Sequence, residues 1–204
     1  GFAPLRDVRF CSGFSLPKIL KDNVNNPWLS RFAWLTAVTT WLLIGLGGLV
    51  TSKGVGMSVP DWPTTYGYNM FLFPISQWVG GIFYEHTHRL LASFVGLLTA
   101  ILAMWVWSRE ARGWERRGAL IFIICALGLM GVRTQTMFVV MAAIAAIGVV
   151  FCFIHAIKSE EPLRWWVGVA FCGVIVQGVL GGLRVTAMAD AVAWLGSKKI
   201  SETH

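Results

Sequence analysis

The sequence predicts an all-α fold, a polytopic membrane helix bundle with about four to five transmembrane helices. Its 204 residues are 56% hydrophobic and only 13% charged, with a mean hydropathy of +0.65, which is too apolar for a soluble domain of this size. Several apolar runs approach the roughly 20 residues that cross a hydrocarbon core about 30 Å thick. Lys and Arg stand at the ends of these runs rather than along one polar face. The net charge of +7 is therefore interpreted as a topology signal, and no nucleic-acid partner is expected.

The apolar runs predict where the chain crosses the membrane. Five spans are expected, at about residues 32–51, 82–107, 119–132, 137–157 and 165–185. These spans divide the chain into a basic N-terminal segment at 1–31, a transmembrane bundle at 32–188 with an outer loop at 52–81, and an outer tail at 189–204. The third span is short, so it forms a tight hairpin with the fourth if both cross the membrane.

The basic residues in the short connections predict the orientation. They precede the first span, follow the second and precede the fifth: Arg6, Arg9, Lys18, Lys21, Arg31, Arg109, Arg112, Arg116, Arg117, Lys158 and Arg164. All of these positions fall on one side, which the positive-inside rule makes cytoplasmic. The N-terminus is therefore expected in the cytoplasm, and the loop at 52–81, with Lys53 as its only basic residue, outside.

The outer loop carries stiff prolines beside aromatic residues that favour burial. It reads Pro60-Asp61-Trp62-Pro63-Thr64-Thr65-Tyr66-Gly67, with Phe71, Phe73, Pro74 and Trp78 further on. One interpretation is a lid that folds back over the membrane surface. The other is an anchor at the interface.

Three kinds of ionisable residue occur together at the outer end of the second span. Glu85, His88 and Arg89 are spaced i, i+3 and i+4, so a helix places them on one face, while His86 points elsewhere, toward the lid or the lipid head groups. Ionisable residues inside a membrane usually face a bundle interior and mark a functional site. A neutral imidazole is a good axial ligand for haem iron, and an arginine can pair with a haem propionate. The alternative is a structural Glu85–Arg89 ion pair with an interfacial histidine.

Small residues in the first and fifth spans give a second signal. Glycines that let a helix or a flat ligand approach the backbone are Gly45, Gly47, Gly48, Gly178, Gly181 and Gly182. Gln177 adds a hydrogen-bonding group at the same level of the membrane. Simple helix packing is the alternative explanation for each glycine.

Taken together, these motifs resemble the N-terminal half of the haem A synthase family. They are Gly47-Gly48-Leu49-Val50-Thr51, Pro60-Asp61-Trp62-Pro63, Glu85-x-x-His88-Arg89 and Gln177-Gly178-Val179-Leu180-Gly181-Gly182-Leu183-Arg184-Val185-Thr186. The resemblance implies one four-helix half of an eight-helix bundle in the bacterial inner (plasma) membrane. It also implies oxidation of a ring methyl of haem O to a formyl group, which yields haem A for cytochrome oxidase.

The resemblance implies roles for individual residues. His88 is expected to bind haem iron as an axial ligand, and Glu85 to be the catalytic glutamate of the motif. Arg89, Gln177, Gly181 and Gly182 are expected to bind the haem. The implied partners are haem O, O2, an electron donor and the lipid bilayer. A homo-oligomer or a second half of the protein, which could hold haem b, would complete the assembly.

The sequence also departs from the family pattern. In the family, the helix with the Gln-Gly-x-Leu-Gly-Gly motif follows the helix with the Glu-x-x-His-Arg motif almost directly. Here about 45 residues, from Gly118 to Pro162, separate the two helices, which suggests an inserted hairpin. A second axial histidine is missing, because His155 is expected near the inner face and His204 is terminal. Two alternatives therefore stay open: a non-catalytic haem-binding or electron-transfer module that pairs His88 with a histidine of another chain, and an inactive truncated product.

Overall fold

The chain is an all-α helix bundle. The computed structural model describes residues 26–129, 135–160 and 162–201. Within these ranges the helices are α2 (Pro27–Ser52), α3 (Gly80–Glu110), α4 (Gly113–Leu129), α5 (Gln135–Lys158) and α6 (Leu163–Ser201), and the α2–α3 loop holds two short turns, η1 (Met70–Leu72) and η2 (Ile75–Gln77). The described residues form no β-strand, only an isolated bridge between Thr65 and Tyr68. The predicted fold class is confirmed.

The ends of α2 follow from local sequence. The side chain of Asn26 caps the helix by accepting hydrogen bonds from the backbone N–H groups of Trp28 and Leu29, at 3.1 and 3.3 Å. Pro27 occupies the first turn, where its missing N–H costs nothing. The helix ends before Gly54, whose φ of +64° turns the chain into the loop.

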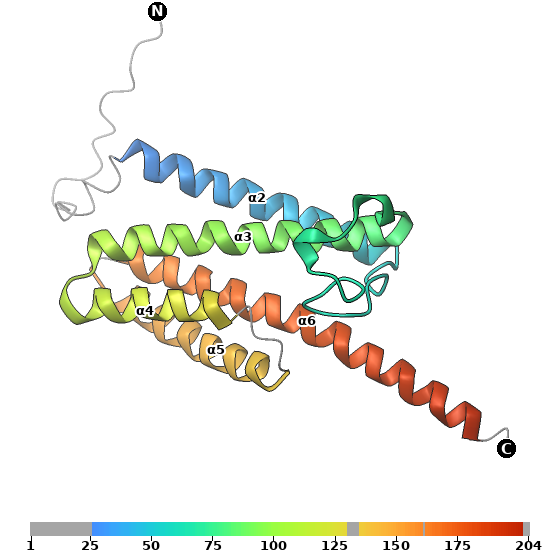
Figure 1. Cartoon of the computed structure of the whole chain (residues 1–204). Coiled ribbons are helices and arrows are strands. Elements are labelled where there is room, and N and C mark those ends of the chain that lie inside the picture. Colours follow the sequence, from blue (N-terminus) through green and yellow to red (C-terminus); the bar gives the residue numbers. More distant parts are fainter. Residues whose placement is uncertain (1–25, 130–134, 161, 202–204) are drawn as a thin grey trace, which may run out of the picture.

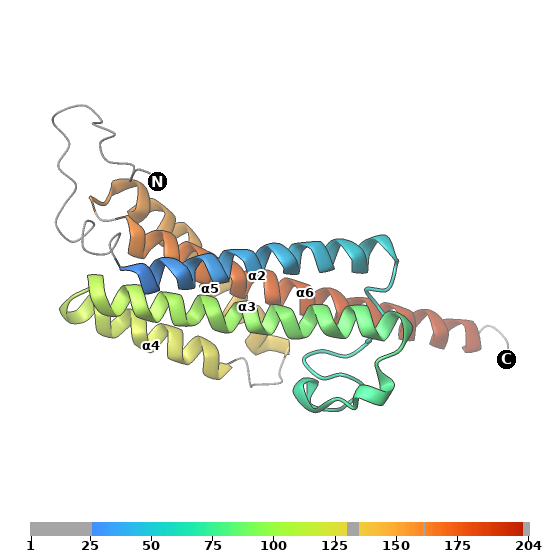
Figure 2. The same ribbon diagram turned by 90° about the horizontal axis from the view of Figure 1, so that it is seen from above.

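Helix α3 is the centre of the bundle. Helices α2, α4 and α6 run in one direction and α3 and α5 in the other (Figures 1 and 2). Helix α3 packs against α2, α4 and α6, while α5 packs along α6. The main buried cluster joins α3 to α4, α5 and α6. Its apolar residues include Ala100, Ala103, Ile123, Phe138, Met141, Phe171 and Ile175.

Within the described ranges, four helices are long and apolar enough to cross a membrane: α2, α3, α5 and α6. The chain is therefore a multi-pass membrane protein, and the apolar faces that its helices turn outward suit contact with lipid. The short span expected at 119–132 corresponds to α4, which has 17 residues. At 1.5 Å per residue α4 is about 26 Å long, less than a hydrocarbon core of about 30 Å.

Helix α6 differs most from the expected span. It is one helix of 39 residues that continues past residue 185 and protrudes beyond the other helices (Figure 1). The segment at 189–204, expected as an outer tail, is helical as far as Ser201. Its first residues are rich in alanine and contain no proline, which favours continued helix. Most of the basic segment expected at 1–31 lies outside the described residues.

The end of the bundle away from the loop is closed by aromatic and charged contacts. The rings of Trp107 on α3 and Trp165 on α6 meet edge to face, with centroids 5.0 Å apart. The guanidinium of Arg164 lies over both rings. The backbone N–H of Arg164 donates to the Glu110 carboxylate at 3.2 Å. The start of α6 is thus fastened to the end of α3.

Close contact between α5 and α6 depends on two glycines. A methyl group at Gly168 would lie 2.8 Å from the Sγ of Cys152, and one at Gly148 would lie 2.9 Å from the Sγ of Cys172. Each glycine therefore makes room for the thiol of the opposite helix.

We predict that Gly168→Ala destabilises the α5–α6 pair, because the added methyl overpacks the contact with Cys152 at a cost of about 1–3 kcal/mol. Gly173→Ala on the same helix is the control, since a methyl there meets no atom within 4 Å and alanine is the better helix former. Thermal unfolding in detergent should give a lower midpoint for the first variant and an unchanged or higher one for the second. Equal midpoints would contradict the packing described here.

Candidate functional site

The first turns of α3 carry a buried ion pair. The Nη2 of Arg89 lies 2.8 Å from the Oε1 of Glu85, four residues earlier on the same helix. Their side chains are only 9% and 4% exposed. Removing either partner of such a pair leaves an uncompensated buried charge and costs roughly 3–5 kcal/mol. The structure therefore contains the Glu85–Arg89 ion pair that the alternative interpretation expected.

The ion pair holds the backbone of the outer loop. The Nη1 of Arg89 donates to the carbonyls of Asp61 and Thr64, at 2.6 and 3.1 Å, and its Nη2 donates to the carbonyl of Val59 at 2.8 Å. The Oε2 of Glu85 accepts from the N–H of Val59 at 2.8 Å. Segment 59–64 is thus docked on α3 by groups that would otherwise be costly to bury.

Asp61 fixes the turn that follows. Its carboxylate accepts hydrogen bonds from the Thr64 hydroxyl and from the N–H groups of Tyr66 and Gly67, the last two at 2.7 and 2.9 Å. Partial burial by itself raises the pKa of Asp61, but the bonds from Gly67, Thr64 and Tyr66 outweigh it and hold the pKa below the ordinary 3.8. Loop 61–67 is therefore a rigid turn built around a carboxylate.

His86 faces the loop, one of the two directions expected for it. Its ring is completely buried and its Nδ1 lies 3.2 Å from the hydroxyl of Thr65, which is also fully buried. Phe73 and Trp78 pack against the ring, with centroids 5.1 and 4.6 Å away. His86 therefore serves as the core around which the second half of the loop folds.

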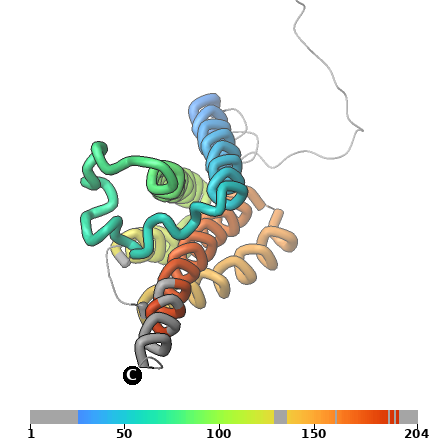
Figure 3. Tube along the Cα trace, turned by 90° about the vertical axis from the view of Figure 1, so that its right-hand side faces the viewer, coloured from blue at the N-terminus to red at the C-terminus, as the bar shows by residue number. Residues whose placement is uncertain are grey.

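Trp62 carries the loop across to α5 and α6. Its indole lies directly on Gly182 of α6, where no side chain could fit. The same ring meets Phe138 of α5 edge to face, with centroids 4.3 Å apart. Figure 3, which looks at the loop end of the bundle, shows the loop spreading beside α3 and reaching toward α6.

The two interpretations of the outer loop each hold for part of it. Segment 59–65 folds back on the bundle as a lid would. In contrast, Phe71, Leu72 and Ile75 are 68–80% exposed, as an interfacial anchor would be. We call segment 59–65 the docked segment.

His88 is turned away from the ion pair, toward α2. A methyl group at Gly47 would lie 3.1 Å from its Cε1, so this glycine makes room for the imidazole. The Nδ1 of His88 is buried and has no hydrogen-bond partner. A buried ring nitrogen without a partner is costly, and it suits a ligand that the structure does not contain. Glu85, His88 and Arg89 thus occupy one turn but divide between two neighbours.

The remaining residues expected to bind haem lie on α6. Gly182 is covered by Trp62, so its backbone is not free to meet a flat ligand in this arrangement. Gly181 and Gln177 lie on the exposed side of α6, and a methyl at Gly181 would meet no atom within 4 Å. Methyl groups at Gly45 and Gly48 on α2 would likewise meet no atom within 4 Å.

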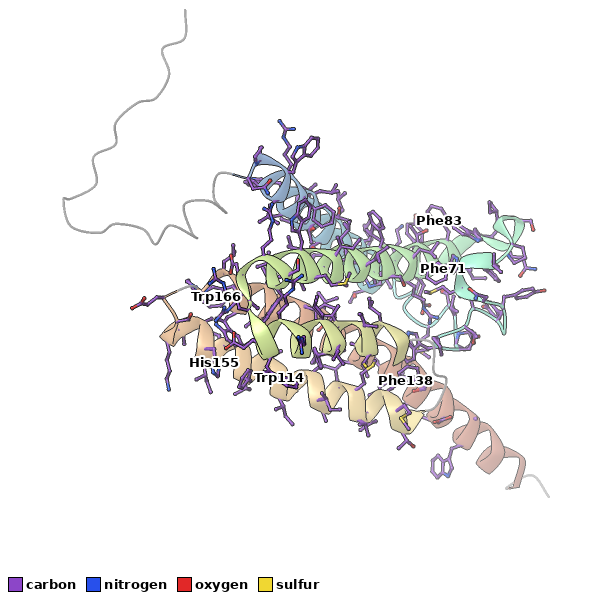
Figure 4. The ribbon with its side chains drawn as sticks, turned by 60° about the vertical axis from the view of Figure 1, so that its left-hand side comes forward. Phe71, Phe83, Trp114, Phe138, His155 and Trp166 are labelled. Atoms are coloured by element: carbon purple, nitrogen blue, oxygen red, sulfur yellow. The ribbon has the colours of Figure 1, made fainter. Side chains whose placement is uncertain are left out.

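His155 lies at the opposite end of the molecule from the docked segment. Figure 4 shows it near Trp166, far from Phe71 in the loop. Its ring packs between Phe151 and Trp165, with centroids 4.1 and 4.6 Å away. His204 lies outside the described residues. Among the described residues, no three His, Cys, Asp or Glu side chains gather as ligands for a metal ion.

Comparisons with known proteins agree with the sequence motifs. Over 107 residues, half of its length, the chain is 33% identical to a protein named heme A synthase from Shouchella clausii. It is 27% identical over 107 residues to heme A synthase from Alkalihalophilus pseudofirmus. This confirms the resemblance to the haem A synthase family. Each match covers about a third of the relative, 34% and 35% of its length. No protein-family model and no solved structure matches the chain.

Sequence reasoning missed the backbone groups that the motif residues bind. The docked segment contributes its carbonyls and the N–H of Val59, which carry no side-chain signal. The seat of Trp62 on Gly182 was also not predicted, although both residues stand in the quoted motifs. The available signal was that Trp62 and Gly182 both stand in these motifs, since two motifs distant in the sequence can meet in one contact.

We predict that Arg89→Met releases the docked segment, because three loop carbonyls and the Glu85 carboxylate lose their donor, at a cost of roughly 3–5 kcal/mol. Limited proteolysis of the α2–α3 loop in detergent should become at least tenfold faster. Arg164→Met, at the far end of the bundle, is the matched control and should leave the loop's cleavage rate unchanged. An intact loop in the Arg89 variant would refute this role.

A second prediction concerns acid. Because the folded pKa of Asp61 is depressed, its stabilisation is fully present above pH 3.8 and is lost as the pH falls below that value through the folded pKa. The variant Asp61→Asn should unfold at a lower temperature than the wild type at pH 7. That difference should shrink as the pH is lowered below 3.8. A difference that stays constant from pH 7 to pH 3 would show that the carboxylate does not support the turn.

Proposed function

We propose that this chain binds haem O and takes part in oxidising a ring methyl of that substrate to a formyl group, as a haem A synthase. The observation that carries the proposal is His88: a half-buried imidazole on a membrane helix, seated against Gly47, with its Nδ1 atom buried and unpartnered. A neutral imidazole of this kind suits haem iron. The relatives' name supplies the reaction.

Exposed glycines support the approach of a flat apolar ligand to α2 and α6. Gly45 and Gly48 on α2 and Gly181 on α6 are exposed, and a methyl group at each would meet no atom within 4 Å. Arg89 and Gln177 are the polar groups proposed to hold the edges of the porphyrin. Contact of haem with Gly182 would require Trp62 to move from its seat.

Glu85 is the proposed catalytic residue. Both of its oxygens are already held, one by Arg89 and the other by the N–H of Val59, so the carboxylate has a fixed position on the loop side of the helix turn that carries His88. A fixed carboxylate can accept or return a proton during oxidation of the methyl group. The oxidant is O2, and electrons come from a donor outside the described residues.

The proposed setting is the bacterial inner membrane with the N-terminus in the cytoplasm. The basic residues Arg109, Arg112, Arg116 and Arg117 lie at the end of the bundle away from the loop, as the positive-inside rule requires of a cytoplasmic face. A second half of the protein or a second copy of the chain would supply the other axial histidine.

The test uses the detergent-purified chain. We expect His88→Ala to lower its haem content at least tenfold, measured by absorption spectra and by chromatography of extracted haem. His155→Ala is the matched control, because that histidine packs between aromatic rings at the far end, and it should keep the wild-type haem content. Equal haem loss in both variants, or none in either, would contradict the assignment of His88.

The role of Glu85 is tested separately. Glu85→Gln keeps the size of the side chain but breaks the ion pair with Arg89. Because His88 is turned away from that pair, toward α2, the haem content should stay within about twofold of wild type. Formation of hydroxylated or formyl haem should fall by at least a hundredfold, because an amide cannot exchange the proton. Normal product formation in this variant would overturn the catalytic role.

A further inference from the structure

The docked segment is held at two places that lie on different helices. One is the ion pair on α3, which binds the backbone of Val59, Asp61 and Thr64. The other is the contact of Trp62 with Gly182 on α6 and Phe138 on α5. The segment is therefore a strap between α3 and the α5–α6 pair.

The contact with Trp62 requires a glycine at position 182 but not at position 181. A methyl group there would overlap the indole of Trp62, whereas a methyl on the adjacent Gly181 would meet nothing within 4 Å. Phe138 is only 3% exposed and adds an apolar edge to the same seat. A large aromatic ring on a glycine backbone, closed by a second ring, is a well-defined packing geometry.

The strap connects to the polar residues through a short stretch of backbone. Asp61 lies next to Trp62, and its carbonyl accepts from Arg89 at 2.6 Å. Thr65, a few residues on, has its hydroxyl against His86 and is fully buried. A displacement of the Trp62 ring that is passed to its backbone would move the carbonyls that orient Arg89 and, through Arg89, the carboxylate of Glu85.

We propose that Trp62, seated on Gly182, is a positioning residue for the Glu85–Arg89 pair. The seat couples α6 to the ion pair on α3, so that the docked segment keeps its place only while Trp62 occupies Gly182. The importance of this coupling for catalysis rests on the proposed function. The coupling itself is a property of the chain without haem.

The experiment measures undocking at a point remote from the seat. Thr65→Cys places a thiol at a fully buried position against α3, and a membrane-impermeant maleimide then reports how often the segment leaves the helix. The chain is studied haem-free in lipid nanodiscs, with labelling of the native cysteines subtracted. We expect Gly182→Ala in this background to raise the labelling rate at least tenfold.

Two further variants separate coupling from general damage. Gly181→Ala is the matched control, and its labelling rate should equal that of the parent. Trp62→Leu in the Thr65→Cys background empties the seat without adding a methyl group to α6, so its labelling rate should rise as it does in Gly182→Ala. A local packing role would predict no change at position 65 in Gly182→Ala, and that result would overturn the proposal, as would equal labelling in the Gly181 and Gly182 variants.

The outcome is independent of the proposed reaction. If the wild-type chain retains no haem but Gly182→Ala exposes position 65, the proposed function is contradicted while the coupling stands. If haem is retained and position 65 stays protected, the coupling fails and the proposed function is unaffected. A second readout on active protein is the kinetic split: a displaced carboxylate lowers kcat more than it raises KM for haem O.

Discussion

The ion pair between Glu85 and Arg89 is the interaction on which the outer half of the molecule depends. Two charged side chains buried in a membrane protein require full hydrogen bonding, and the loop backbone provides it through Val59, Asp61 and Thr64. The same requirement explains why the loop folds back over α3. The buried ion pair and the folded loop thus both follow from the need to hydrogen-bond buried charges.

The arrangement separates His88 from the other polar residues of its turn, although the buried Nε2 of His86 also lacks a hydrogen-bond partner. Its neighbours Glu85, His86 and Arg89 all face the loop, whereas His88 faces the glycine-bearing part of α2. This turn of α3 therefore presents an imidazole toward α2 and a fixed carboxylate toward the loop.

Much of the fold followed from simple physical chemistry. Apolar runs predicted the long helices α2, α3, α5 and α6, because only a helix satisfies its own backbone in lipid. The extent of α6 beyond residue 185 was not predicted, since hydropathy marks the membrane and not the end of a helix.

The spacing of Glu85, His88 and Arg89 predicted the shared helix turn and the possible Glu85–Arg89 ion pair, which the structure contains, but the loop partners of these residues were not predictable. Arg89 binds carbonyls, which every residue possesses, so side-chain patterns cannot reveal its choice. The seat of Trp62 on Gly182 depends on how α6 crosses the loop, which is a tertiary property. Gly182 was expected to meet haem for the same reason that it meets an indole, because both are flat and require a bare backbone.

The central claim is that the loop backbone is docked on the ion pair of α3. Its most direct test is the hydrogen exchange of the Val59 amide, which donates to the buried carboxylate of Glu85, measured by NMR on the isotope-labelled chain in nanodiscs. The account predicts exchange at least about a hundredfold slower than in an unstructured peptide, because the loop must undock before the amide meets water. Exchange at the rate of a free peptide would contradict it.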